Sequence, residues 1–87
     1  MTNSFKLEIL TPRKRVFTGE VASLVAPGEL GYLGVLANHA PLVTTLVPGK
    51  VTLRDAAGGT QVFQSSGEGL LEVYHNQVTL LLDAVAV

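Results

Sequence analysis

Three glycines, an Asn-His pair and a proline occur close together in the stretch Gly28–Leu42, which reads GELGYLGVLANHAPL. The glycines are three positions apart, a spacing that loosely resembles a phosphate-binding loop. Such a loop needs backbone N–H groups that converge at the N-terminus of a helix, but Asn38 and Pro41 interrupt the residues that follow. The glycines are therefore better explained by positive φ angles and a close approach of the backbone.

Histidine offers a second candidate chemistry, through His39 and His75. A structural zinc site needs about four ligands, mostly Cys and His, whereas this chain has two His and no Cys. A Ser-His-Asp hydrolase needs a serine on a sharp turn, but Ser65 and Ser66 belong to no Gly-x-Ser-x-Gly motif. We therefore predict no catalytic residue, no metal site and no cofactor, and expect His39 to hydrogen-bond the backbone of a loop or to contact a partner.

Charged side chains give no paired-carboxylate site. Glu8 alternates with apolar residues, which turns it to the outward face of a strand, and the chain has no Trp to build a sugar-binding groove around Glu68 and Glu72. The one cluster of charge, Arg13-Lys14-Arg15, is typical of a solvated turn; the alternative is contact with an acidic patch on a protein partner. With a net charge of −1, nothing in the composition attracts nucleic acid.

The stretch Gly28–Leu42 and the residue after it also hold more apolar side chains than a small core can bury at once. These are Tyr32, Leu33, Val35, Leu36, Leu42 and Val43. Glycine and proline would hold some of them outward as a preformed apolar ridge, which suits protein docking because little ordering entropy is lost on binding. The alternative is that they close the open end of a sandwich, and residue chemistry alone leaves both open.

The bulk composition indicates one compact domain, which we expect to span residues 1–87. Hydrophobic residues make up 47% of the chain and mean hydropathy is +0.39, which excludes a disordered class. Only 15% of the residues are charged, which fits either a surface that another protein partly covers or simply a compact small domain. We find no signal peptide and no run of the roughly 20 apolar residues that span a bilayer, so we expect membrane association only through partners.

Turn signals recur at short intervals and leave runs of strand length between them. Phe5–Ile9 and Val51–Arg54 alternate between apolar and polar residues, as a half-buried strand does. Further strands are expected at Glu20–Ala26, Leu42–Val47, Thr60–Gln64, Leu70–Tyr74 and Val78–Leu82. Hairpin turns are expected at Ala56–Gly59 and Asn76–Gln77, whereas the glycine-rich stretch is too interrupted for a helix or a long strand. This spacing predicts an all-β sandwich or barrel.

Several motifs together resemble the N-terminal domain of the epsilon subunit of rotary F-type ATP synthases. They are Pro12 followed by Phe17-Thr18-Gly19, the Gly31–Leu42 loop that ends in His-Ala-Pro-Leu, Leu46-Val47-Pro48-Gly49, and the tail GLLEVYHNQVTLLLDAV. The resemblance runs from about residue 5 to residue 85. It implies an all-β fold, a flattened sandwich of two antiparallel sheets with about ten short strands.

The resemblance also implies a non-catalytic rotor subunit of the central stalk, which docks the gamma subunit to the c-ring and couples proton flow to ATP synthesis. Such a subunit lies peripherally on the cytoplasmic face of the inner, energy-transducing membrane. Matched residue by residue, the positions expected near gamma are Thr11, His39, Pro41, Leu42 and Thr44. Those expected near the c-ring are Gly31, Tyr32, Leu33 and Gly34.

Three positions depart from the family pattern. Tyr32 stands where many relatives have an acidic residue, Ala37-Asn38 replaces the usual Pro-Gly, and Glu68 replaces a common second glycine. The family usually continues into a two-helix hairpin that this sequence does not contain, so we expect only docking and coupling. The alternative function is a β-sandwich module that binds a small ligand or a carbohydrate, and an enzyme ranks third.

Overall fold

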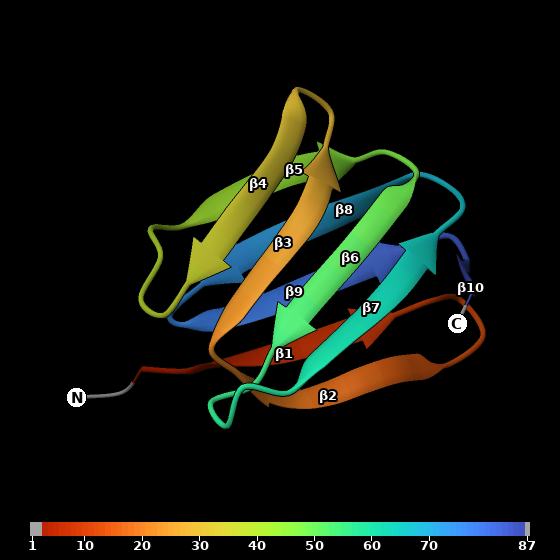
Figure 1. The fold of residues 1–87 in the computed structure, drawn as a ribbon. Helices are drawn as coiled ribbons and strands as arrows, with labels where there is room; N and C mark the ends of the chain where they lie inside the picture. The colour runs from red at the N-terminus through yellow and green to blue at the C-terminus, as the bar shows by residue number, and fades with distance from the viewer. Residues whose placement is uncertain (1–2, 87) are drawn as a thin grey trace.

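The computed structural model describes residues 3–86, which form ten β-strands and, within that range, no helix (Figure 1). The strands are β1 (Phe5–Leu10), β2 (Arg15–Val21), β3 (Ser23–Gly28), β4 (Gly31–Leu36), β5 (Leu42–Leu46), β6 (Gly49–Arg54), β7 (Thr60–Ser65), β8 (Gly69–Tyr74), β9 (Gln77–Leu82) and β10 (Val85–Ala86). Alternation places Phe5, Leu7 and Ile9 of β1 inward, as the sequence indicates. The all-β prediction is confirmed.

The strands form one hydrogen-bonded network that is folded into two layers (Figure 1). The front layer has the order β10-β7-β6-β3-β4, and the back layer has the order β5-β8-β9-β1-β2. The layers are joined where Gly28 of β3 pairs with Leu46 of β5. The two-layer sandwich is therefore confirmed. One pair departs from the antiparallel rule, because β1 and β9 run parallel.

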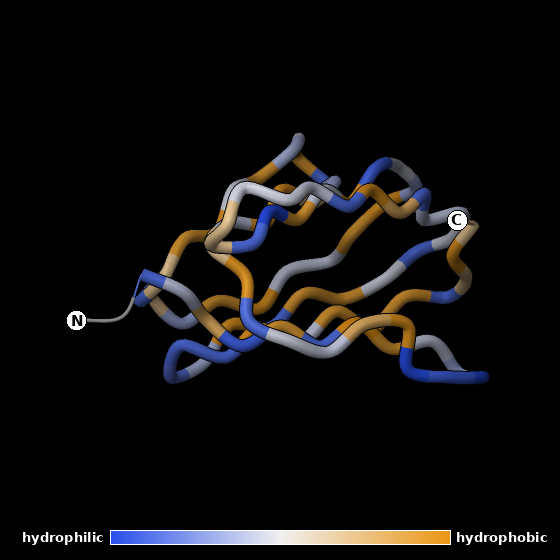
Figure 2. Tube along the Cα trace, turned by 60° about the horizontal axis from the view of Figure 1, so that its bottom comes forward, coloured by the Kyte–Doolittle hydropathy of each residue, from blue (hydrophilic) through white to orange (hydrophobic). Residues whose placement is uncertain are grey.

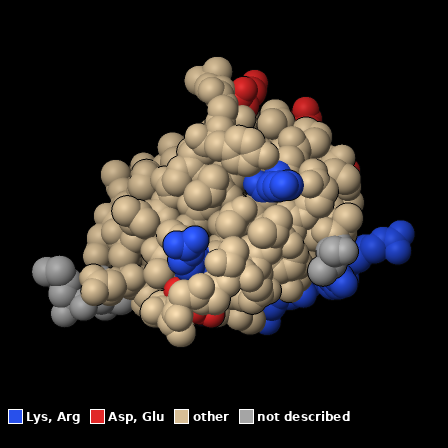
Figure 3. All heavy atoms as spheres, viewed as in Figure 1, with Lys and Arg blue, Asp and Glu red and all other residues tan. Residues whose placement is uncertain are grey.

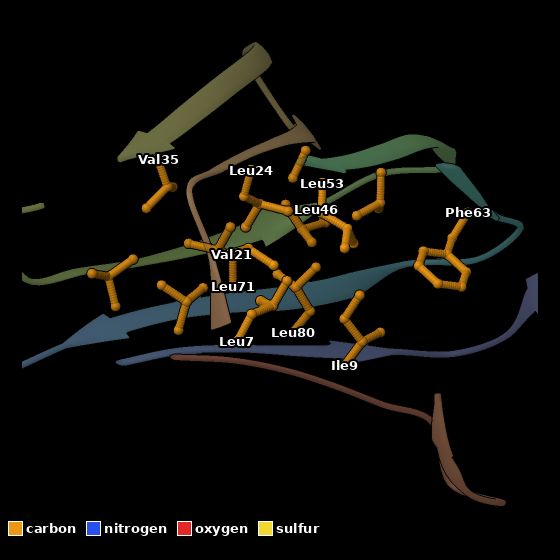
Figure 4. Close-up of a cluster of buried hydrophobic side chains, with 14 of the residues drawn as sticks. Leu7, Ile9, Val21, Leu24, Val35, Leu46, Leu53, Phe63, Leu71 and Leu80 are labelled. Atoms are coloured by element: carbon orange, nitrogen blue, oxygen red, sulfur yellow. The ribbon is translucent and has the colours of Figure 1, made fainter. Parts of the chain in front are cut away.

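The core lies between the two layers and is almost entirely aliphatic. Figure 4 shows Leu24 and Leu53 of the front layer pointing toward Leu7, Leu71 and Leu80 of the back layer, and all five are at most 2% exposed. Hydrophobic segments occur in both layers, whereas the most hydrophilic segments lie at turns (Figure 2). Both layers therefore contribute their inward faces to a single core.

One expected strand, Glu20–Ala26, is two strands in the structure. β2 ends at Val21 and β3 begins at Ser23, because the chain passes from the back layer to the front layer at Ala22. Ala22 N–H donates to the Arg54 carbonyl at 2.7 Å, so this crossing is tied to β6. The inward residues on either side of the crossing, Val21 and Leu24, are three positions apart, so the alternation shifts by one residue at Ala22, a break that the sequence analysis did not use.

The two expected hairpin turns are both present, and one is displaced. The turn at Ala56–Gly59 is confirmed: Asp55 Oδ1 accepts backbone N–H groups at 2.9 and 2.8 Å, and Gly58 has a φ of 95°. The turn expected at Asn76–Gln77 lies one residue earlier. His75 and Asn76 have φ angles of 51° and 57°, as a two-residue hairpin turn requires, and Gln77 already belongs to β9.

The basic cluster is divided between a turn and a strand. Arg13 and Lys14 lie in the β1–β2 turn, as expected, but Arg15 begins β2. Its Nε lies 3.4 Å from Oε2 of Glu8 on the neighbouring strand. Glu8 points outward, as its alternation predicts, and forms an ion pair there.

Candidate functional site

The glycine-rich stretch forms a β-hairpin instead of an irregular loop. Gly28 and Gly31 are paired residues that close a two-residue turn, Glu29–Leu30, between β3 and β4. Gly31 has a φ of 128°, which favours glycine. A Cβ at Gly28 would lie 2.6 Å from the Leu33 side chain and 2.8 Å from the Gly31 carbonyl oxygen. Two of the three glycines are therefore explained by the turn, which the sequence analysis did not recognise.

The third glycine, Gly34, has no comparable constraint. It pairs with Val25 of β3 and faces away from the core. A Cβ at this position would meet only the Leu24 carbonyl oxygen, at 3.9 Å. Gly34 therefore leaves a shallow notch in the outward surface of the front layer, between the exposed side chains of Tyr32 and Leu36 on the same strand.

Tyr32 is exposed but held in place. Its side chain is 60% accessible, and its hydroxyl accepts the Lys50 backbone N–H at 3.1 Å. A Cβ at Gly49 would lie 2.9 Å from that hydroxyl and 2.8 Å from Cβ of Pro27. The tyrosine ring therefore lies over β3 and reaches β6, and glycine at position 49 leaves the room for it. This side chain presents an apolar surface of fixed shape.

The apolar residues of the stretch divide between the core and the surface. Val35 is buried, and Leu33 is half-buried against the core. Tyr32 and Leu36 are 60% and 64% exposed on the outer side of the front layer, whereas Val43 is 62% exposed on the outer side of the back layer. The sequence left open whether these residues form an outward apolar ridge or close the end of the sandwich. Each interpretation applies to some of them, because part of the stretch closes the core and part is exposed.

An open groove of about 330 Å³ lies between β4 and β5. It is lined by Gly28, Glu29, Leu30, Gly31, Tyr32, Leu33, Leu42 and Thr44. Three residues expected near the c-ring and two expected near gamma therefore meet in one place. The Thr45 hydroxyl donates to Oε1 of Glu29 at 2.6 Å, which ties the tip of the β3–β4 hairpin to β5.

The loop between β4 and β5 is held by the side chain of Asn76, a residue that the sequence places in a turn without indicating this contact. Asn38 has a φ of 63°, as expected for an asparagine in place of glycine, and its backbone N–H donates to Oδ1 of Asn76 at 2.6 Å. The Asn76 amide in turn donates to the Ser4 carbonyl at 3.0 Å. His39 Nδ1 lies 2.7 Å from the Ala40 carbonyl oxygen, so the expected hydrogen bond from His39 to the backbone is confirmed.

His39 and Pro41 line a second open hollow, of about 400 Å³, together with His75 and Asn76. The two histidines therefore approach the same hollow, although they are far apart in the sequence. Residues 3–86 contain no group of three or more His, Cys, Asp or Glu side chains that could hold a metal ion. Within that range, no helix is long and apolar enough to cross a membrane.

Thr11 lies apart from the other residues expected near gamma. It lines a third groove, of about 510 Å³, formed by the β1–β2 turn and by Asp83, Ala84 and Val85. The whole of β1, roughly 20 Å, separates Thr11 from the end of the sandwich where Asn76 lies. Thr11 also has a structural role, since its hydroxyl accepts the Lys14 backbone N–H at 3.3 Å. The gamma candidates thus occupy three different hollows.

The front layer adds exposed residues that the sequence analysis did not select. Val25 on β3 and Val62 on β7 are 40% and 50% exposed, and Lys50 on β6 is exposed beside Tyr32. β3 is the hairpin partner of β4, but β6 and β7 join the same layer through pairings with β3 and with each other. A sequence pattern gives the outward side of each strand but not which strands are neighbours, so no local signal could have grouped these residues.

Comparison with known proteins gives one family. A family model described as "ATP synthase, Delta/Epsilon chain, beta-sandwich domain" matches residues 4–86. The ATP synthase epsilon chain of Dichelobacter nodosus is 43% identical over 86 residues, which cover 99% of this chain and 59% of that protein. The epsilon chain of Xanthomonas euvesicatoria is 44% identical over 81 residues, which cover 93% and 57%. The chain thus spans less than two thirds of the length of these curated relatives.

Solved structures share the fold. A chain in the Euglena gracilis mitochondrial ATP synthase, determined as an OSCP/F1/c-ring assembly, superposes with a TM-score of 0.91 at 20% identity, covering 99% of this chain and 54% of that chain. A chain in the central stalk and c-ring of the Tetrahymena thermophila mitochondrial ATP synthase gives a TM-score of 0.76 at 15% identity, with coverages of 93% and 64%. At these identities the likeness shows the architecture alone.

Proposed function

The chain belongs to the family of the ATP synthase Delta/Epsilon chain beta-sandwich domain, and from this we propose that it is a non-catalytic part of the central stalk. In this role it docks the gamma subunit to the c-ring and couples proton flow to ATP synthesis. The observation on which the proposal rests is the family match over residues 4–86. The same match disfavours the alternative, a module that binds a small ligand or a carbohydrate.

The mechanical demands of a rotor joint agree with the structure. A joint under torque must not deform, and the hairpin of β3 and β4 is held by several contacts outside its own ladder. Its tip is bonded to Thr45, the Tyr32 hydroxyl to the Lys50 backbone, and the following loop to Asn76. Because these groups are already ordered, binding a partner costs little additional conformational entropy. A stable joint of this kind needs roughly 1,000 Å² of buried surface or more.

We assign the contact residues according to the groove and hollow that they line. The proposed gamma contacts are Leu42 and Thr44 in the β4–β5 groove, His39 and Pro41 in the neighbouring hollow, and Thr11 at the β1–β2 turn. The proposed c-ring contacts are Gly31, Tyr32, Leu33 and Gly34 on β4. The two structural neighbours belong to assemblies that include a c-ring, which supports a position of this fold beside the ring.

The same reasoning gives a location. We propose that the protein is peripheral, on the cytoplasmic face of the inner, energy-transducing membrane, and that it is attached through gamma and the c-ring. The support is the family match and the finding that residues 3–86 include no helix able to span a bilayer.

Co-purification with gamma tests the proposal. The tagged protein and the gamma subunit of the same organism are expressed together, and gamma is expected to remain bound through size-exclusion chromatography. Thr44→Lys in the groove should reduce its retention by roughly tenfold, since the lysine would place an unpaired charge in the buried contact. Thr18→Lys, an exposed threonine on β2, is the matched control and should leave retention unchanged. Folded gamma that fails to bind the unaltered protein would refute the proposal.

A further inference from the structure

The two histidines of the chain line one open hollow, although they are far apart in the sequence. His39 lies in the β4–β5 loop and His75 in the β8–β9 turn, two segments found together at the left of Figure 1. The Asn38 backbone N–H donates to Oδ1 of Asn76 at 2.6 Å, and each of these two asparagines is the chain neighbour of one histidine. The fold therefore fixes the two imidazoles beside the same hollow.

The ring of His39 has the hydrogen bond that is usual for a metal-binding imidazole. Its Nδ1 lies 2.7 Å from the Ala40 carbonyl oxygen, and because a carbonyl oxygen only accepts, Nδ1 carries the proton. In the neutral ring the available lone pair is then on Nε2. Metal-binding histidines commonly donate their other ring N–H to a backbone carbonyl, which fixes both the tautomer and the orientation of the ring. His39 is thus prepared to act as a ligand through Nε2.

His75 stands at a turn position that does not require histidine. Its φ is 51°, and that of Asn76 is 57°, a combination for which glycine, asparagine and aspartate are the favoured residues. The ring makes an edge contact with Tyr74, with ring centroids 4.0 Å apart and an interplanar angle of 68°. The side chain is also exposed, so a dissolved ion can reach it. The turn therefore explains the backbone at this position but not the imidazole.

The lining of the hollow discriminates among cations. Among residues 3–86 it consists of Asn38, His39, Ala40, Pro41, His75 and Asn76, without Lys, Arg, Asp or Glu. On the side that Figure 3 shows, the surface over the β4–β5 loop also has no charged side chain. Mg²⁺ and Ca²⁺ prefer oxygen ligands, carboxylates above all, and this lining offers no carboxylate. Imidazole instead suits Zn²⁺, Cu²⁺ and Ni²⁺.

We propose that His39 and His75 together bind a divalent transition metal such as Zn²⁺, through Nε2 of His39 and a ring nitrogen of His75. Residues 3–86 offer no group of three such protein ligands, so water completes the coordination. The sequence analysis predicted no metal site because a structural zinc site needs about four protein ligands. That reasoning concerned a closed site, whereas two ligands at an open hollow form an exchangeable one. The proposal concerns the chain by itself and does not rest on the proposed function.

Zinc titration of the untagged protein tests the site, with ZnCl₂ in a buffer that does not chelate metal and calorimetry as the measurement. The chain has two His and no Cys, so His39→Gln and His75→Gln each leave a single imidazole. Once one imidazole has bound the metal, the second binds it within the same molecule. Each variant should therefore bind Zn²⁺ at least roughly tenfold more weakly.

Two controls accompany this titration. Gln77→Asn changes an exposed side chain beside the same turn and should leave the affinity for Zn²⁺ unchanged. MgCl₂ at the same concentration should give no binding, because the hollow provides imidazole instead of carboxylate.

Thermal unfolding gives a second measurement. A metal that binds the native state more tightly than the unfolded chain raises Tm, and only the folded chain brings the two imidazoles together. Zn²⁺ should thus raise the Tm of the unaltered protein more than that of either single variant. The proposal would be overturned if the unaltered protein does not bind Zn²⁺, if either variant retains full affinity, or if sedimentation shows that Zn²⁺ joins two molecules. None of these results involves gamma, so failure of this proposal leaves the proposed function standing.

Discussion

The outward surface of the front layer (the front face) and the outward surface of the back layer (the back face) differ in the charges they carry. The front face has two cations and no carboxylate among its outward residues. The outward residues of the back layer include both signs: Lys6, Glu8, Arg15, Glu20 and Glu72. On the back layer Arg15 pairs with Glu8, and Glu20 accepts the Ser4 hydroxyl at 2.8 Å.

This difference separates what the fold requires from what contact with a neighbour requires. The inward residues of both layers are equally buried, so the core gives no reason for unlike outer faces. Charges of mixed sign on the back layer interact with one another and with water. The two cations of the front face lie among exposed apolar side chains and have no carboxylate among the other outward residues, a composition suited to the apolar centre and charged rim of a protein interface. The back layer also exposes apolar side chains, those of Val43, Tyr74 and Leu81, but beside charges of both signs.

The largest loss of stability should follow truncation of a core leucine, and it should be similar in both layers because they share one core. Leu24 of β3 and Leu71 of β8 are both 0% exposed. Truncating either one to alanine should lower the free energy of unfolding by about 2–5 kcal/mol, through lost burial and the cavity left behind. Chemical denaturation followed by circular dichroism measures this. A large loss for one layer and none for the other would show that the layers do not share a core.

The next largest loss of stability should distinguish two glycines of the β3–β4 hairpin when each is replaced by alanine. Gly28→Ala places a Cβ 2.6 Å from the Leu33 side chain and 2.8 Å from a backbone oxygen, and should cost about 1–3 kcal/mol. Gly34→Ala is the matched control: its Cβ meets nothing closer than 3.9 Å, so we expect a change of roughly 0.5 kcal/mol or a slight stabilisation. Thermal unfolding of the two variants compares them. Equal losses would contradict the assignment of Gly34 to the surface.

A smaller loss of stability is expected when the contact between the β4–β5 loop and Asn76 of the back layer is removed. Asn76→Gly keeps a residue that accepts the positive φ but removes the amide that bonds Asn38 and Ser4. Loss of two hydrogen bonds should cost about 1–2 kcal/mol. Hydrogen exchange should then accelerate at Asn38 more than in β6. Unchanged exchange at Asn38 would mean that the amide does not hold the loop.

The smallest change in stability is expected when one charged side chain on each outer surface is replaced. Arg15→Met removes an exposed ion pair, so it should cost only about 0.2–1 kcal/mol and less at high salt. Lys50→Met removes a cation without a carboxylate beside it and should change stability by less than roughly 0.5 kcal/mol at any salt concentration. Denaturation at two ionic strengths compares the two. A salt-dependent loss for Lys50→Met would reveal a carboxylate partner within the chain.

Most strands could be predicted from the sequence, because alternation and turn residues are local signals. β1, β6 and the turn at Ala56–Gly59 follow directly from them. β4 could not be recognised, since glycines at positions 31 and 34 interrupt its apolar pattern. The break at Ala22 shifts the alternation by one residue, but that the chain changes layer there depends on which strands pair.

The candidate site was only partly predictable. The resemblance selected residues on β4 and β5, and the structure brings five of them into one groove. It also selected Thr11, which the length of β1 separates from the rest. Lys50 and Asn76 have no distinguishing motif, and their contacts with Tyr32 and Asn38 depend on pairings between distant segments.

The central proposal is that β4 carries contact residues in the assembled ATP synthase, whereas no contact is proposed on the outer surface of β2. The chain has no cysteine, so single cysteines can be introduced at Leu36, which is 64% exposed, or at Thr18, which is also exposed. Maleimide labelling is then compared between the free protein and the purified complex. The account predicts that assembly protects Leu36→Cys and leaves Thr18→Cys reactive. Equal reactivity of Leu36→Cys in the free protein and in the complex would contradict it.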